Sequence, residues 1–192
     1  MRHGIGPTCL AAALLLLAGS VEAVEKRAPA TPVRETRLER LTRALAEGDV
    51  RARLAAVSGL IALGGEPVVA ALAAAAVSDA SPAVREEATY GLGQVGTAAA
   101  THALGKLLLD PEPDVREAAI EAAAAAGGDA AARVLAFALG DEDPALREEA
   151  VYALGEIGGE VAIGVLQRAL TDDDQSVREA AAAVLAEIRP QP

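Results

Sequence analysis

The chain has 192 residues, a formal net charge of −11 at pH 7, and only three aromatic residues, one Phe and two Tyr. Alanine is its commonest apolar residue, and the runs of β-branched or aromatic residues that are typical of strands are missing. This composition predicts an all-α core packed through small side chains. The acidic balance argues against nucleic acid or an anionic membrane surface as the partner.

Residues 1–23 are predicted to be a secretory signal peptide. Arg2 precedes the apolar run Cys9–Gly19, and Val21–Ala23 places small residues where a signal peptidase reads them. The run is about half of the ~20 residues needed to span a bilayer, so a retained membrane anchor is the weaker interpretation. Cleavage after Ala23 would remove the single cysteine and predicts a secreted or periplasmic protein without disulfides.

Residues 24–36 follow as a flexible lead-in, with two prolines and few apolar side chains. Residues 24–53 carry eight basic and five acidic residues, whereas residues 54–192 carry eight basic and 22 acidic residues. The chain therefore has a basic start and a strongly acidic body.

From about residue 37 the sequence repeats with a period of 31 residues. An Asp and, six positions later, an Arg recur in register as Asp79 and Arg85, Asp110 and Arg116, Asp141 and Arg147, and Asp172 and Arg178. An earlier and less regular copy contains Arg53, which lies 32 residues before Arg85. That copy holds one inserted residue, which we place near Gly65–Val69.

Each copy is predicted to form two helices, A and B. Apolar residues just before the Arg and three, seven and ten residues after it lie on one face of helix A. Ser81 and Asp143, each followed by proline, mark its start, and a glycine eleven residues after the Arg marks its end. The expected B helices, with Leu104, Leu135 and Leu166 facing inward, are Ala98–Leu109, Ala130–Leu139 and Val161–Leu170.

Capping helices are expected at both ends of the array. Arg37–Asp49 forms an opening B-type helix, and Gln175–Ile188 forms a lone closing A-type helix. A single pair cannot bury its apolar stripe, but stacked pairs can. The sequence therefore predicts an all-α, right-handed α-α superhelix over residues 37–189, with about four helix pairs between the caps.

The segments DASPAVREEATYGLGQVG (Asp79–Gly96) and DEDPALREEAVYALGEIG (Asp141–Gly158) resemble HEAT repeats, in the short form of phycobilisome-lyase-type HEAT-like repeats. The resemblance covers about residues 37–189. It implies that the recurring Asp and Arg residues form a ladder of charged hydrogen bonds between neighbouring repeats. The first copy departs from the pattern, because Glu47 stands where an Asp is expected before Arg53.

No pattern in the sequence predicts catalysis, a cofactor or a metal. His102 is the only histidine after residue 23, and the glycines end helices instead of following strands as in phosphate loops. The pairs Glu86–Glu87 and Glu148–Glu149 recur because the repeat does, on what we expect to be solvated helix starts. Asp172–Asp174 lacks the spaced oxygens and the glycine of a calcium loop.

One candidate contact site lies on helix B, on the side facing away from the leucines. This side is expected to form the concave surface of the solenoid, where ligands dock. It carries His102, Lys106, Arg133, Phe137, Gln167 and Arg168. An exposed aromatic residue between cations is typical of a binding anchor, but cations also suit helix C-termini and Phe137 could bend inward.

A second candidate surface is formed by Tyr90, Glu121 and Tyr152, which share one repeat position on helix A. They form either an exposed stripe or a set in which each tyrosine ring rests on a neighbouring helix and keeps its hydroxyl in water.

The sequence thus predicts an exported protein–protein interaction module, a scaffold, adaptor or accessory subunit, whose partner is anionic or mixed apolar and acidic at the contact. Three alternatives stay open. Some proteins with such repeats are bilin lyases or their subunits, although no residue here supports that activity. The chain could instead self-assemble, including weak head-to-tail association through the basic opening helix. An uncleaved N-terminus would tether it to a membrane.

Overall fold

The computed structural model describes residues 35–188, and these form ten helices and no strand. The predicted signal peptide and residues 24–34 of the lead-in lie outside the described residues. Four helix pairs stand between α2 (Arg37–Glu47) and α11 (Gln175–Ile188): α3 (Val50–Leu63) with α4 (Glu66–Ser78), α5 (Pro82–Val95) with α6 (Ala98–Leu107), α7 (Pro113–Ala126) with α8 (Gly128–Ala138), and α9 (Pro144–Ile157) with α10 (Gly159–Ala169). The expected all-α solenoid is confirmed.

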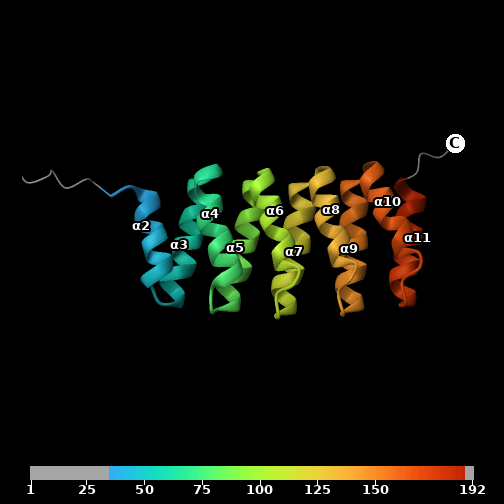
Figure 1. Cartoon of the computed structure of the whole chain (residues 1–192), viewed down its shortest axis with the longest axis horizontal. Coiled ribbons are helices and arrows are strands. Elements are labelled where there is room, and N and C mark those ends of the chain that lie inside the picture. The colour runs from blue at the N-terminus through green and yellow to red at the C-terminus, as the bar shows by residue number, and fades with distance from the viewer. Residues whose placement is uncertain (1–34, 189–192) are drawn as a thin grey trace, which may run out of the picture. The chain divides into compact units, whose positions relative to one another are not determined.

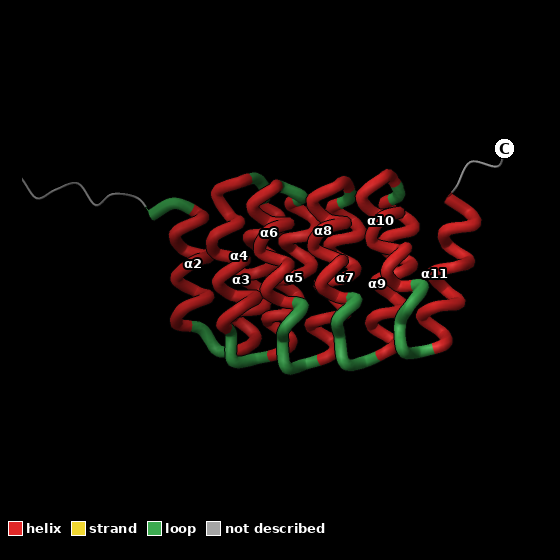
Figure 2. The backbone as a smooth tube through the Cα atoms, turned by 45° about the vertical axis from the view of Figure 1, so that its right-hand side comes forward, coloured by secondary structure: helices red, strands yellow, loops and turns green. Residues whose placement is uncertain are grey.

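The paired helices of the array and the closing helix α11 stand in two rows (Figures 1 and 2). The A row contains α3, α5, α7, α9 and α11, and the B row contains α4, α6, α8 and α10. Each helix packs against its partner in the other row and against its neighbours in its own row. Within the described part of the chain, no helix is both long and apolar enough to cross a bilayer.

Glycine makes the tight turn from the A row to the B row. Gly64, Gly96, Gly127 and Gly158 all have positive φ, between 61° and 67°, which other residues adopt only with strain. The B helices α8 and α10 begin directly after this glycine, two residues earlier than the sequence predicted, and they end one residue earlier. The inserted residue lies between Gly64 and Asp79, which are 15 positions apart, whereas Gly96 and Asp110 are 14 apart.

Only one of the two predicted N-cap side chains of the A helices caps its helix. Asp143 does cap α9, because its carboxylate accepts the backbone N–H of Ala145 at 2.9 Å. Ser81 makes no such bond. Instead the carboxylate of Asp79 accepts the backbone N–H of Ser81 at 2.8 Å, so the ladder residue itself shapes the turn.

The core lies between the two rows and is made mostly of leucine, valine and alanine. Leu104, Leu135 and Leu166 are fully buried, as their inward prediction required. Small residues let the A helices approach closely: a Cβ added at Gly93 of α5 would lie 2.8 Å from the Cα of Ala122 in α7. The opening helix α2 has no fully buried residue, but its partly buried Leu38, Leu41 and Leu45 pack against the end of the core.

The predicted ladder is present along the inter-repeat turns. Each of four arginines donates from Nε to a carboxylate oxygen of the Asp in the next repeat, over 2.7–3.0 Å: Arg53 to Asp79, Arg85 to Asp110, Arg116 to Asp141, and Arg147 to Asp172. Nη2 donates to the second oxygen of the same carboxylate. Nη1 reaches back to a backbone carbonyl of the arginine's own turn. Each arginine therefore ties two successive turns together.

The two ends of the ladder differ. Arg53 makes the complete contact although its own turn lacks the Asp, because its backbone acceptor there is the carbonyl of Gly48 at 3.0 Å. Glu47 therefore does not weaken the first rung. Arg178, the last ladder arginine, donates only to the carbonyls of Asp172 and Asp173 within the described residues.

We predict that Arg116→Ala lowers the free energy of unfolding by ~2–4 kcal/mol in urea denaturation, because it leaves a nearly buried carboxylate without its partner. The side chains of Arg116 and Asp141 are only 9% and 5% exposed. Arg178→Ala is the matched control, and it should cost less than about 1 kcal/mol because no carboxylate loses a partner. Equal losses for the two variants would contradict a stabilising role for the inter-repeat pair.

Candidate functional site

The six residues predicted from helix B are all exposed in the structure, on α6, α8 and α10. We call His102, Lys106, Arg133, Phe137, Gln167 and Arg168 the B-helix face. The structure brings their helices together as neighbours in the B row (Figure 2). The concavity of this face stays a prediction.

Phe137 does not bend inward. This residue, the only Phe of the chain, is 72% exposed. It forms part of a hollow of about 350 Å³ that also contains Leu109, which is 83% exposed, and the ladder residues Asp110 and Arg116. A second hollow, of about 680 Å³, lies on the other side of Phe137 between α8 and α10. Phe137 therefore borders two recesses, one at the inter-repeat turns and one between α8 and α10.

Sequence reasoning missed Leu109. It was expected as the last residue of a helix, but α6 ends at Leu107 and Leu109 lies in the turn that follows. A signal was available, because the residue just before the ladder Asp is Ser78, Gly140 or Thr171 in the other copies. An apolar residue at that position is outside the repeat pattern and adds to the apolar surface near Phe137.

The cations of the B-helix face are the only ones in residues 54–188 that are not part of the ladder. Lys106 and Arg168 make no ion pair within the described residues, and Arg133 has only an exposed contact of 3.9 Å with Asp129 of its own helix. The acidic residues of the B row lie in the first helical turns: Glu66, Asp129 and Glu160. Lys106 and Arg168 instead lie in the last turns of α6 and α10. A cation there interacts favourably with the helix dipole and also remains available to a partner.

The tyrosine stripe on the A row is divided in the structure. The hydroxyl of Tyr90 in α5 donates to the carboxylate of Glu121 in α7 at 2.9 Å. This bond, followed by burial, raises the pKa of Tyr90 to about 12. The hydroxyl of Tyr152 in α9 instead donates to Glu148 of its own helix at 3.1 Å. Tyr90 is therefore a link between repeats, whereas Tyr152, half exposed, is not.

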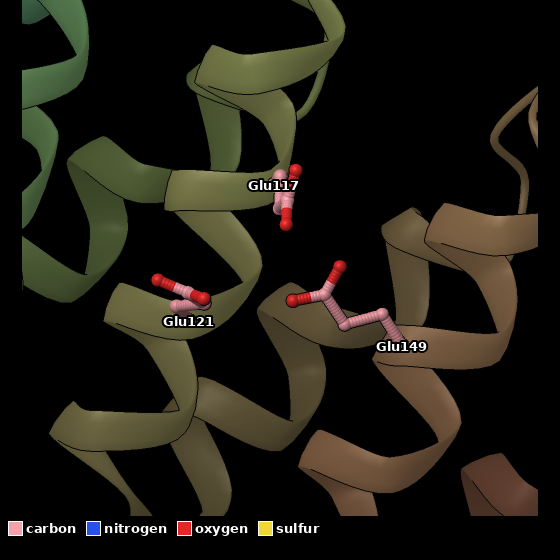
Figure 3. Close-up of side chains that lie close together, drawn as sticks. All are labelled: Glu117, Glu121 and Glu149. Carbon is pink, nitrogen blue, oxygen red and sulfur yellow. The ribbon is translucent and has the colours of Figure 1, made fainter.

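Three carboxylates meet beside this stripe, where α7 faces α9. Figure 3 shows Glu149 reaching from α9 toward Glu117 and Glu121 of α7. Oxygen atoms of the three side chains lie within 4.8 Å of one another. Burial, followed by repulsion from the other two carboxylates, raises the pKa of Glu149 from 4.5 to about 7. The expectation that the pairs Glu86–Glu87 and Glu148–Glu149 lie on a solvated helix face is wrong, because all four side chains are half-buried.

This acidic cluster is the one group of His, Cys, Asp and Glu residues in the described part of the chain whose members could share a metal ion. Hard cations prefer carboxylate oxygens of this kind. The repeat explains the cluster without a ligand, because it brings helix positions of successive A helices side by side, and exposed acidic groups are common without an ion. The sequence signal lay in two adjacent copies: Glu117 and Glu121 follow the ladder Arg116 by one and five residues, and Glu149 follows Arg147 by two.

Comparison with known proteins agrees with the repeat geometry. A family model described as HEAT repeats matches residues 38–124, 69–141 and 101–186, which together cover most of the chain. The chain belongs to the HEAT-repeat family. None of the curated proteins matches it.

Solved structures place this HEAT-repeat protein among helical solenoids. It is similar to a chain from the complex of CpcE and CpcF of phycocyanin lyase from Nostoc sp., with 26% identity, a TM-score of 0.59, and coverage of 85% of this chain and 69% of that one. Human deoxyhypusine hydroxylase follows with 25% identity, a TM-score of 0.56, and coverage of 78% and 61%. A designed armadillo repeat protein in complex with a (KR)4 peptide, at 20% identity, a TM-score of 0.53, and coverage of 78% and 80%, shows the fold alone.

We predict that the stability of the protein contains a component that falls as the pH rises from about 4.5 to above 7, because folding raises the pKa of Glu149 and the folded state holds that proton more tightly. Glu149→Gln should remove roughly 1 kcal/mol of this fall, a discounted figure because a half-exposed carboxylate is screened. Urea unfolding on both sides of this pH range measures the effect.

The matched control is Glu87→Gln, at the same repeat position of α5. This substitution leaves all three carboxylates of the acidic cluster in place. A Glu149→Gln profile that follows the unsubstituted protein would contradict the assigned role of the cluster.

Proposed function

We propose that this HEAT-repeat protein is an exported protein–protein interaction module that binds its partner on the B-helix face. One observation carries the proposal: the only Phe stands exposed among the only cations of residues 54–188 that the ladder does not use. Aromatic and arginine side chains dominate the binding energy of protein interfaces, so this combination on an otherwise acidic body marks a contact surface.

The family and its structural neighbours support a binding role. HEAT solenoids present long helical surfaces on which other chains dock. The neighbour at 26% identity is a chain from a complex of two proteins, CpcE and CpcF. The partner of the present chain would be another protein or a peptide, with anionic or mixed apolar and acidic chemistry at the contact. Nucleic acid is disfavoured by the net charge of −11.

Export rests on the N-terminal sequence alone. A basic residue, a short apolar run and small residues before position 24 are the pattern of a cleaved signal peptide. A mature protein that begins at Val24 by mass spectrometry would support secretion or a periplasmic location, and a protein that still carries residues 1–23 would instead support tethering to a membrane.

A second candidate function is that of a lyase-type subunit or tetrapyrrole-binding protein, favoured by the similarity to a chain of phycocyanin lyase. Within residues 35–188, we find no arrangement of side chains that indicates a lyase reaction. Visible absorbance of the protein purified from its native cells would favour this candidate over the first. A self-assembling array, including head-to-tail contact through the basic helix α2, would instead show melting that depends on protein concentration.

We predict that the Phe137→Ala/Arg168→Glu double variant loses at least about tenfold in affinity for the native partner, because it removes the aromatic anchor and reverses a charge at the contact. Affinity capture followed by titration of the captured protein measures this. Helicity and unfolding should be unchanged, since both side chains are exposed. Tyr152→Ala is the matched control, because Tyr152 is an exposed aromatic on the A row. Partner binding that survives the double variant would remove the B-helix face from the proposal.

A further inference from the structure

The larger hollow of the B-helix face is lined by apolar side chains and by two arginines. We propose that this hollow, between α8 and α10, receives an apolar side chain of an extended acidic polypeptide segment, and that a neighbouring carboxylate of the segment pairs with Arg133 and Arg168. This inference rests on the proposed function and names the chemistry of the partner.

The hollow is open above residue 164, which is a glycine. A Cβ added at Gly164 would meet no atom within 4 Å, so no close packing requires a glycine there. The same repeat position carries His102 in α6 and Arg133 in α8, so the fold accepts large side chains at this point. A glycine inside a helix lowers helix stability. Its effect at this position is to leave the space above residue 164 open, in a hollow of about 680 Å³ that Phe137 also lines.

The lining of the hollow is apolar at its base and cationic along much of its rim. Ala136, Val161 and Val165 contribute apolar surface beside Phe137. Arg133, Arg168 and Glu160 provide the charged groups, so the rim carries a net charge of +1. Glu160 lies in the first turn of α10 and Arg168 in its last turn. The carboxylate of a bound segment is therefore directed toward Arg168, and its apolar side chain fits over Gly164.

The recess continues beyond one side chain, which favours a polypeptide over a small molecule. A smaller hollow of about 290 Å³ shares Ala136 and Arg168 with it, and the hollow that contains Leu109 shares Phe137 with it. Three open recesses thus border one another through shared lining residues. Small-molecule sites are instead usually enclosed and bury most of their ligand. An extended segment can occupy successive recesses with successive side chains.

The test uses a pair of glycine variants that separates binding from folding. Gly164→Leu places a side chain in the hollow, and Gly105→Leu adds the same side chain to α6 outside it, where the new Cβ would lie 3.9 Å from Val134. Both substitutions replace a helical glycine by a better helix former, so neither should lower the melting temperature. A library of random twelve-residue peptides displayed on phage is panned against the purified protein. The selected peptides are then synthesised and titrated by fluorescence anisotropy.

We expect the selected peptides to carry Asp or Glu next to Leu, Ile or Phe. Their affinity should fall about tenfold on Gly164→Leu and change less than about twofold on Gly105→Leu. Arg168→Glu should weaken the acidic peptides as well, and their binding should decline with added salt. Selection of basic peptides, selection of none, or equal binding to the two glycine variants would each overturn the inference.

The outcome for the proposed function is read separately, from the native partner. A partner that is lost on Phe137→Ala/Arg168→Glu but retained on Gly164→Leu would keep the B-helix face as the interface and reject the hollow as its anchor site. A partner that is retained by both variants would reject the B-helix face itself.

Discussion

The arginine–aspartate ladder is the interaction on which the rest of the array depends. Each bidentate pair holds two turns at a fixed separation, and its third guanidinium nitrogen fixes the arginine to its own turn. The hydrogen bond from Arg147 outweighs the opposing effect of burial and holds the pKa of Asp172 below its ordinary value. Alanine side chains are small and do little to fix the register of packed helices, so the fixed turns set that register. The same turns place the B-helix face on neighbouring helices.

The period of 31 residues was enough to predict this fold, because it places an apolar stripe in every copy, a proline start in three copies and a glycine end in four. The starts of α8 and α10 were predicted two residues too late, because the second glycine of the turn, such as Gly128, is the first residue of the helix. The ladder partner of each arginine followed from the family resemblance. The complete rung at Arg53 could not be read from its own copy, because the acceptor there is a backbone oxygen.

The candidate site was predictable in part for the same reason. Outward positions of helix B could be counted from the repeat, so Phe137 and its cations were found. Contacts between copies could not be counted in that way. The pKa of Glu149 depends on side chains of another helix, and the exposure of Leu109 depends on where α6 ends. The hollow at Gly164 was also invisible, because a sequence does not show which glycines have empty space above them.

The unequal ends of the ladder bear on how the array can change in length. The turn before α3 holds Arg53 through the carbonyl of Gly48 without a ladder aspartate, whereas Arg178 keeps the donors of a full rung at the other end. A repeat inserted after α11 would bring its own aspartate and complete that rung, with the rest of the chain left as it is. Lengthening by duplication of a 31-residue unit is therefore a small step for this architecture, and repeat number can vary within it independently of the surface on α8 and α10.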